Sequence, residues 1–256
     1  MLGLQRNTGN YLTLSQTVSP SSSVLSTLTG SSGSPGFQRG SLPARMPEIE
    51  LRKLASSHPN LVIVKLDATN LASVTEAAAF VGDYLKDTGL NVLINNAGIL
   101  KGMTLDTVSE EDMEDVYKTN VTGPLLVSKA FLPLLRKAAQ GSSQKGLSCS
   151  KAAIVNISSL LGCIELVPAT YSKPVIAYRC SKAALNMLTM CQSLTYKEDG
   201  ILCTAVHPGW VKTDMGTQEA VMTVDESVRG ILQVLPNLAD EHNGTLVNWK
   251  GKKLPW

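Results

Sequence analysis

The first 45 residues of the chain contain no Asp or Glu, and the first acidic residue is Glu48. Ser, Thr and Gly dominate this stretch, in runs such as SPSSSV and TGSSGSPG. Such a composition buries too little apolar surface to order a chain. The stretch lacks the basic region and apolar core of a secretory signal, and it faintly resembles an organelle transit peptide. We expect residues 1–46 to be a low-complexity, disordered tail.

Three further absences exclude classes of protein. No apolar run is long enough to span a membrane. The five cysteines are odd in number and form no CxxC pair, which argues against a disulfide framework and against a zinc site. The net charge of +2 comes without a basic block, so nucleic acid is not an expected partner. We therefore expect a cytoplasmic protein with no metal and no membrane partner.

The remainder of the chain, residues 47–256, alternates predicted helices and strands. Helices are expected at 48–57, 73–87, 109–139, 178–195 and 223–238, and strands at 61–67, 91–98, 152–157, 201–209 and 244–249. This alternation indicates βαβ units with right-handed crossovers. We predict a single α/β domain over residues 47–256, with a doubly wound parallel sheet of the Rossmann type.

Polar and small residues gather where the predicted strands end. They are Asp67, residues 95–98, Ser159 and residues 208–213. Ligands of such sheets bind beyond the carboxyl ends of the strands, so one crevice is expected to collect all four groups.

Tyr178 and Lys182 are four residues apart at the start of a predicted helix, so their side chains share one face. A cation beside a phenol favours the phenolate and lowers the pKa of the phenol from about 10. Such a tyrosine can exchange a proton with a carbonyl or alcohol oxygen, and a serine at the end of the preceding strand can bond the same oxygen. Each feature also occurs without any catalytic role, since YxxxK is common on helices and Ser is a common turn residue. Ser158 competes with Ser159 for the serine role, and Tyr171 competes with Tyr178 only by residue type.

Five motifs in order resemble those of the short-chain dehydrogenases/reductases. They are NNAG at 95–98, Asn120, NISS ending at Ser159, Tyr178 with Lys182, and PGWVKTDM at 208–215. The segments HPNLVIVKLDATN and GTLVNWKGKKLPW are most similar to the C-factor and sniffer-like carbonyl reductases.

The resemblance implies hydride transfer between a nicotinamide cofactor and a small-molecule carbonyl or alcohol. It makes Tyr178 the general acid in reduction, and gives Lys182 the tasks of lowering its pKa and binding the nicotinamide ribose. Ser159 would orient the substrate oxygen, and Asn120 would hold a water linked to Lys182. The subgroup implies NADP, with NAD not excluded, and the family implies a homodimer that pairs the helices 109–139 and 178–195.

Other cofactor contacts are implied at the strand ends. The residues are Asp67 for the adenine, Asn95, Ala97 and Gly98 for the adenosine ribose, and Pro208, Gly209, Val211 and Thr213 for the nicotinamide amide.

The chain departs from the family at its start, where a strand, TGxxxGxG and a helix are expected. Residues 29–36 read TGxxGxxG, follow a poor strand and include Pro35. The interval before Glu48 is too short for a helix and a second strand, so the first βαβ unit is missing or replaced. Two functions follow. One is an active carbonyl reductase whose tail supplies a phosphate site; the other is a catalytically weak or inactive variant that acts by dimerising or without enzymatic activity.

Overall fold

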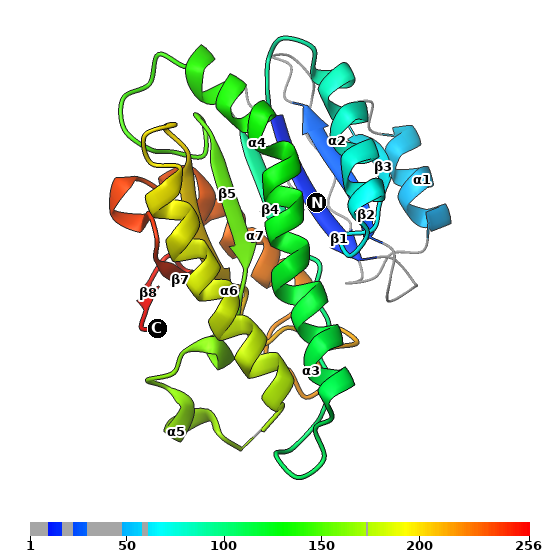
Figure 1. Ribbon diagram of the computed structural model, residues 1–256, viewed down its shortest axis with the longest axis vertical. Helices are drawn as coiled ribbons and strands as arrows, with labels where there is room; N and C mark the ends of the chain where they lie inside the picture. Colours follow the sequence, from blue (N-terminus) through cyan, green and yellow to red (C-terminus); the bar gives the residue numbers. More distant parts are fainter. Residues whose placement is uncertain (1–9, 17–22, 30–47, 58–60, 173) are drawn as a thin grey trace.

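A computed structural model of the chain describes residues 10–16, 23–29, 48–57, 61–172 and 174–256 (Figure 1). The strands are β1 Asn10–Gln16, β2 Ser23–Thr29, β3 Leu61–Leu66, β4 Val92–Asn95, β5 Ala153–Ile157, β6 Leu202–His207, β7 Leu246–Asn248 and β8 Lys253–Leu254. The α-helices are α1 Glu48–Ser57, α2 Leu71–Leu85, α3 Glu110–Tyr117, α4 Gly123–Gly141, α5 Val167–Thr170, α6 Ile176–Thr195 and α7 Val224–Val234. Short turns of other helix types are η1 Lys118–Thr122, η2 Leu160–Gly162, η3 Leu235–Asn237 and η4 Asp240–His242.

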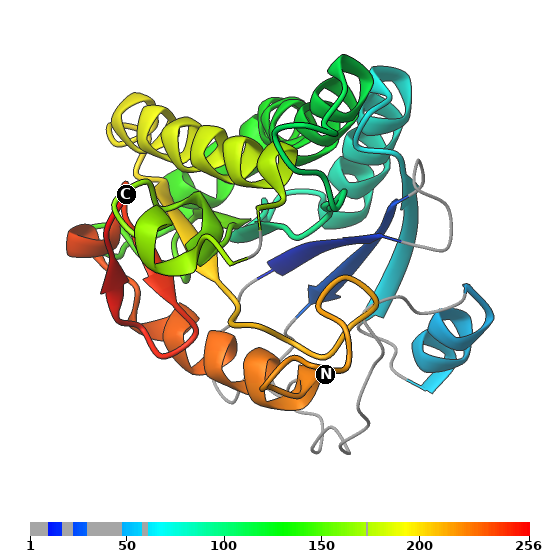
Figure 2. The same cartoon turned by 90° about the horizontal axis from the view of Figure 1, so that it is seen from below.

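These elements form a three-layered α/β structure. The sheet has the strand order β3-β2-β1-β4-β5-β6-β7-β8. Helices α2, α4 and α6 cover one face, while α1 and α7 lie on the other, as the view along the strands shows (Figure 2). The predicted doubly wound, Rossmann-type fold is therefore confirmed. No helix in the described part of the chain is long and apolar enough to cross a membrane.

Two apolar clusters fill the space between the layers. Phe131 and Leu135 of α4 pack with Ile154 of β5 on one face of the sheet. Val155, the next residue along β5, packs with Val234 at the end of α7 on the other face. Successive strand residues point to opposite faces, so a strand covered on both faces needs an unbroken apolar run.

The beginning of the chain differs from the expectation of a disordered tail, because residues 10–16 and 23–29 are strands. Strand β2 runs antiparallel to both β1 and β3, and β8 runs antiparallel to β7. Only residues 17–22 separate β1 from β2, and a parallel crossover needs a dozen residues or more. The prediction that the first βαβ unit is missing or replaced thus has a physical basis in this short connection. Alternation of apolar and polar residues in YLTLSQ is the strand signal that composition alone overlooks. The boundary at residue 46 stays a prediction.

The predicted helix 109–139 is three consecutive elements, α3, η1 and α4. It begins at a capping box, in which Ser109 Oγ accepts from the Asp112 amide at 3.1 Å and the Asp112 carboxylate accepts from the Ser109 amide at 3.2 Å. Pro124 lies in the first turn of α4 and not in its interior, where a missing amide proton costs little. The long helix is interrupted at η1, a π-helical turn that contains Asn120. Turns of this kind are frequent at functional sites.

Candidate active site

Ser159, Tyr178 and Lys182 meet at the carboxyl end of β5. Tyr178 and Lys182 lie on the first turns of α6 and are only 8% and 4% exposed. The Lys182 Nζ donates to the Ile157 carbonyl at 2.7 Å and lies 5.5 Å from the centre of the Tyr178 ring. The four-residue spacing therefore places the ammonium beside the phenol.

The two neighbouring serines have different partners. The Ser159 side chain forms a hydrogen bond with Tyr178, and its Oγ accepts from the Leu161 amide at 3.1 Å. The Ser158 Oγ instead donates to Asn186 Oδ1 at 2.6 Å. Of the two serines, the geometry thus favours Ser159 beside the reacting tyrosine, while Ser158 ties the end of β5 to α6.

The ionisation of the pair is governed by burial. Burial raises the pKa of Tyr178 to about 12, against a smaller lowering by the hydrogen bond with Ser159. Burial also lowers the pKa of Lys182 to about 8. The net pKa of Tyr178 is therefore raised and not lowered as expected, because removal from water disfavours the phenolate more strongly than its neighbours favour it. At neutral pH Tyr178 carries its proton, which is the form that an acid needs.

Asn120 connects η1 to the loop after β4 and to α6. Its Oδ1 accepts from the Ile99 amide at 2.8 Å, and its Nδ2 donates to the Ile99 carbonyl and to Ser181 Oγ, both at 2.9 Å. These bonds use both amide protons of the side chain. Its geometry is that of a brace between α6 and the loop, and its role in holding a water stays a prediction.

Among the residues after β4, Gly98 lies against the side chains of Asn120 and Lys182. A Cβ atom added to Gly98 would lie 3.2 Å from Asn120 Oδ1 and 3.6 Å from Lys182 Nζ. A side chain there would therefore crowd the ammonium. Ala97 is buried beside it. The Asn95 side chain points into the protein, since its Nδ2 donates to Asn156 Oδ1 at 2.9 Å, so only its backbone is available to a cofactor.

Asp67 shapes the turn that follows β3. Its Oδ1 accepts from the Thr69 amide at 2.9 Å and from Thr69 Oγ1 at 2.8 Å. The carboxylate is half-buried at the same end of the sheet as Asn95. A contact with adenine is compatible with this position and stays a prediction.

The loop after β6 folds back on itself. Gly209 has a φ of +90°, and a Cβ there would lie 2.3 Å from Met222 Sδ, so only glycine fits. Val211 pairs with Met222 in an isolated bridge, and the Pro208 carbonyl accepts from Ser227 Oγ at 2.6 Å. Thr213 Oγ1 accepts from the Gly216 amide at 3.0 Å. This bond holds the Thr213 hydroxyl within its own loop.

The glycine-rich residues 29–36 begin at the wrong end of the strands for a phosphate loop. Thr29 pairs with Asn10, at the start of β1. Strand β1 is parallel to β4, and Leu14, near the carboxyl end of β1, pairs with Asn95. Thr29 pairs with the first residue of β1 and therefore lies at the end of the strands opposite to the site. Residues 30–36 lie outside the described part of the chain. The Lys182 ammonium beside Tyr178 thus fits the ribose of a nicotinamide cofactor, whereas no pyrophosphate cradle is identified among the described residues.

Two residues that hold this site together escaped the sequence analysis. A Cβ on Gly162 would lie 2.7 Å from the Lys182 carbonyl carbon, so η2 packs directly on α6. Asn186 Nδ2 donates to the Gly162 carbonyl at 3.3 Å. The available signal was the position of Asn186, one turn after Lys182. Among the described residues, no group of three or more His, Cys, Asp or Glu could hold a metal ion.

This fold and this arrangement of Ser, Tyr and Lys define a dinucleotide-dependent class of proteins, and comparison with known proteins gives the family. A family model described as short chain dehydrogenase matches residues 44–223. Because the match spans more than half of the chain, the chain belongs to the short-chain dehydrogenase family. The C-signal protein of Myxococcus xanthus is 37% identical over 169 residues, which are 65% of this chain and 93% of that protein.

Two solved structures extend the comparison. An NADPH-bound carbonyl reductase from chicken fatty liver is 56% identical, with a TM-score of 0.77, over 81% of this chain and 82% of that one. The carbonyl reductase Sniffer of D. melanogaster is 39% identical, with a TM-score of 0.78, over 81% of this chain and 83% of that one. The resemblance drawn from the motifs, including the sniffer-like subgroup, is confirmed.

Proposed function

We propose that the chain is an NADP-dependent oxidoreductase that reduces an aldehyde or ketone by hydride transfer. The observation that carries this proposal is the buried Ser159–Tyr178–Lys182 arrangement, in which the phenol keeps its proton at neutral pH. The NADPH bound to the chicken carbonyl reductase supports NADP over NAD, and NAD stays a second possibility.

Each side chain has a task in this reaction. When bound, the reduced nicotinamide supplies a hydride to the carbonyl carbon. Tyr178 gives its phenolic proton to the carbonyl oxygen, so that an alcohol and a tyrosinate result. Ser159 Oγ accepts from the Leu161 amide and keeps its own proton to donate to the same oxygen. The Lys182 ammonium, 5.5 Å from the Tyr178 ring, stabilises the tyrosinate.

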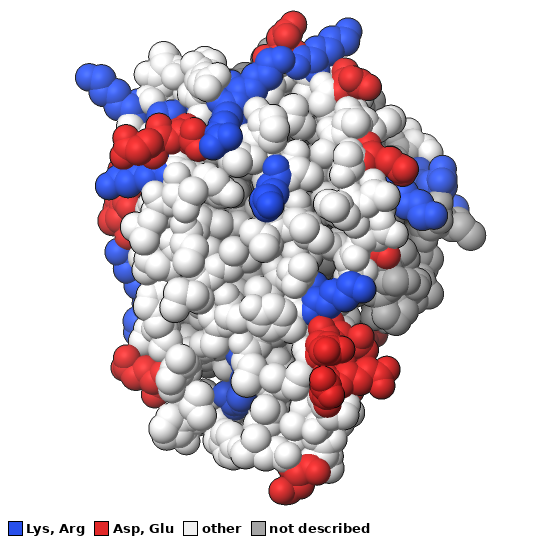
Figure 3. Space-filling model, viewed as in Figure 1, with Lys and Arg blue, Asp and Glu red and all other residues white. Residues whose placement is uncertain are grey.

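A second candidate is a weakly active or non-enzymatic protein that dimerises, and one observation favours it. The glycine-rich segment begins at the end of the strands opposite to the site. Met187 and Leu194 of α6 are 65% and 71% exposed, and few charged side chains cover the middle of the face formed by α4 and α6 (Figure 3). A homodimer through this face is compatible with either function.

Replacement of Tyr178 tests the proposed function. Tyr178→Phe removes only the acidic hydroxyl, so NADPH-dependent reduction of a test aldehyde or ketone should be lost while the fold, followed by circular dichroism, is retained. Tyr171→Phe is the matched control, because Tyr171 is exposed and its ring, which Phe keeps, lies beside the Arg179 guanidinium. Its rate should match that of the wild type. Full activity of Tyr178→Phe would refute the assignment.

A further inference from the structure

A buried arginine follows the catalytic tyrosine. Arg179 is 6% exposed. Its guanidinium contacts the loop of residues 160–171, which follows Ser159. Its Nε donates to the Pro174 carbonyl at 3.0 Å, its Nη1 to Thr170 Oγ1 at 3.1 Å, and its Nη2 to the Thr170 carbonyl. A buried charge is tolerated only where hydrogen bonds compensate its lost hydration. The acceptors in the loop are therefore held in place by the guanidinium.

These bonds lead back to Ser159. The Arg179 Nη1 also approaches the Leu161 carbonyl at 3.5 Å, and the amide of Leu161 donates to Ser159 Oγ. The same residue thus contacts Arg179 through its carbonyl and Ser159 through its amide. Because Ser159 in turn bonds Tyr178, the Arg179 guanidinium is linked to the Tyr178 phenol through Leu161 and Ser159.

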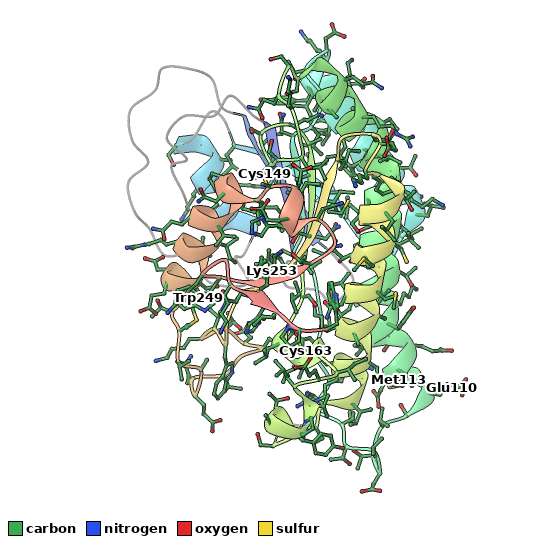
Figure 4. The ribbon with its side chains drawn as sticks, turned by 90° about the vertical axis from the view of Figure 1, so that its left-hand side faces the viewer. Glu110, Met113, Cys149, Cys163, Trp249 and Lys253 are labelled. Carbon is green, nitrogen blue, oxygen red and sulfur yellow. The ribbon has the colours of Figure 1, made fainter. Side chains whose placement is uncertain are left out.

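Three further features constrain the loop and the segment that follows it. Val175, at the start of α6, has a φ of +31°, which is a strained conformation for a β-branched residue and persists only where the surroundings impose it. On the other side, Cys163, labelled in Figure 4, is buried with Ala205 and Leu246 near the C-terminal strands. The Glu165 amide donates to the carbonyl of Trp256 at 3.1 Å.

We propose that Arg179 is a positioning residue, which fixes the 160–171 loop and through Leu161 aims the Ser159 hydroxyl at the substrate oxygen. The inference rests on the proposed function for its catalytic consequence, and on the structure alone for the constraint on the loop. A guanidinium is required, because its planar fork serves several carbonyl and hydroxyl acceptors at once, and an ammonium is a single point of charge.

Hydrogen exchange tests the constraint without any cofactor or substrate. In the full chain, the amides of Gly162 and Cys163 donate to Ser159 and Leu160 carbonyls within the loop. Arg179→Met and Arg179→Lys should remove their protection, with the larger loss in Arg179→Met. Arg136→Met is the matched control, because Arg136 lies in the last part of α4, is half-exposed and pairs with Asp199. This variant should leave the protection of both amides as in the wild type. Unchanged protection in folded Arg179→Met would overturn the proposal.

Kinetics tests the catalytic consequence. Thr170→Val removes the Oγ1 that accepts from Arg179 Nη1, together with the bond that Oγ1 donates to the Leu166 carbonyl, and it leaves the buried charge in place. It therefore also decides the matter if Arg179→Met does not fold. We expect Thr170→Val to expose the same amides and to lower kcat by up to about 10²-fold, the scale of an ångström-sized misplacement, with the Kd for NADPH unchanged. Thr170→Ser, which restores the hydroxyl, should recover kcat. Loss of stability with an unchanged kcat would show a merely structural role and overturn the proposal. If the wild type has no reductase activity, the proposed function fails, and exchange at Gly162 and Cys163 still decides the constraint.

Discussion

At the residue scale, the neighbouring Ser158 and Ser159 should respond differently to replacement. Ser159→Ala removes the hydroxyl beside Tyr178 and should lower kcat by about 10²–10³-fold, as for the loss of one donor to a developing oxyanion. Ser158→Ala leaves Asn186 Oδ1 without its 2.6 Å donor and should lower the free energy of unfolding by about 1–3 kcal/mol. Urea denaturation and steady-state kinetics separate the two effects. The assignment is wrong if Ser158→Ala gives the larger fall in kcat.

Lys182 makes a second prediction, which concerns pH. Its pKa in the folded chain is about 8, below the ordinary 10.5. Between these values the unfolded chain binds more protons than the folded one, so the free energy of unfolding rises with pH. The rise should be on the order of 3 kcal/mol from pH 8 to 10.5. Tyr178, whose pKa is raised to about 12, opposes it only above pH 10.

Denaturation curves of wild type and Lys182→Met over pH 7–10 measure this effect. The variant should lack the rise, since it has no ammonium to bury. Lys129→Met replaces an exposed lysine of α4 and should keep the rise of the wild type. Parallel curves for wild type and Lys182→Met would show that the Lys182 ammonium carries no penalty of burial.

The sequence could predict the Tyr178–Lys182 pair but not the pKa of its members. Their proximity follows from a local helical repeat. The pKa of Tyr178 depends on its burial, which is a matter of tertiary packing. For the same reason the bonds of Arg179 to the 160–171 loop had no local signal.

At the scale of elements, the packing of η2 on α6 places Ser159 beside Tyr178. Gly162 makes this contact possible, because an added Cβ would lie 2.7 Å from the Lys182 carbonyl carbon and 2.9 Å from the Ala183 nitrogen. Both are backbone atoms and cannot move aside. Gly162→Ala should therefore separate η2 from α6, lower the free energy of unfolding by about 1–3 kcal/mol and reduce kcat/KM by up to about 10²-fold.

Gly141→Ala is the control for this substitution. No atom lies within 4 Å of an added Cβ at Gly141, at the end of α4, so the free energy of unfolding should change by less than about 0.5 kcal/mol. Thermal denaturation and kinetics of both variants measure the difference. Equal behaviour of the two alanine variants would mean that η2 is free to move off α6.

Element types were more predictable than their interruptions. The core strands and most helices follow from apolar period and capping residues such as Ser109, which are local signals. The π turn η1 was not located, because the sequence predicts one continuous helix over residues 109–139. The turn places Asn120 against Ile99 and Ser181, and these contacts are distant in sequence.

At the scale of the whole molecule, the sheet order was predictable only where βαβ units repeat. The parallel core β4-β5-β6-β7 follows from alternation of strand and helix. The pairing of β2 with β3 in antiparallel register is nonlocal, and the composition of residues 1–46 gave no hint of it. The short β1–β2 connection leaves no room for the helix that normally follows a phosphate loop.

Cofactor affinity is the property of the whole molecule that this topology should change. A glycine loop supplies several amide bonds to the pyrophosphate, each worth about 1.5–3 kcal/mol when the acceptor is charged. The glycine-rich segment begins at Thr29, and Thr29 and Asn95 lie at opposite ends of the strands. Loss of two such bonds should weaken NADPH binding by roughly 3–6 kcal/mol, or two to four decades. A cofactor otherwise held at micromolar concentration would then bind at millimolar concentration.

Calorimetric titration with NADPH and with reduced nicotinamide mononucleotide measures the missing contribution directly. The mononucleotide keeps the groups that Lys182 and the loop after β6 are proposed to bind, and it lacks the pyrophosphate linkage and the adenosine. If the pyrophosphate is poorly held, the two dissociation constants should differ only by the contribution of the adenosine contacts. Lys182→Met should weaken both ligands equally, because the contact that it removes is common to them. A micromolar constant for NADPH would show that the pyrophosphate is held, and the non-enzymatic candidate would lose its main support.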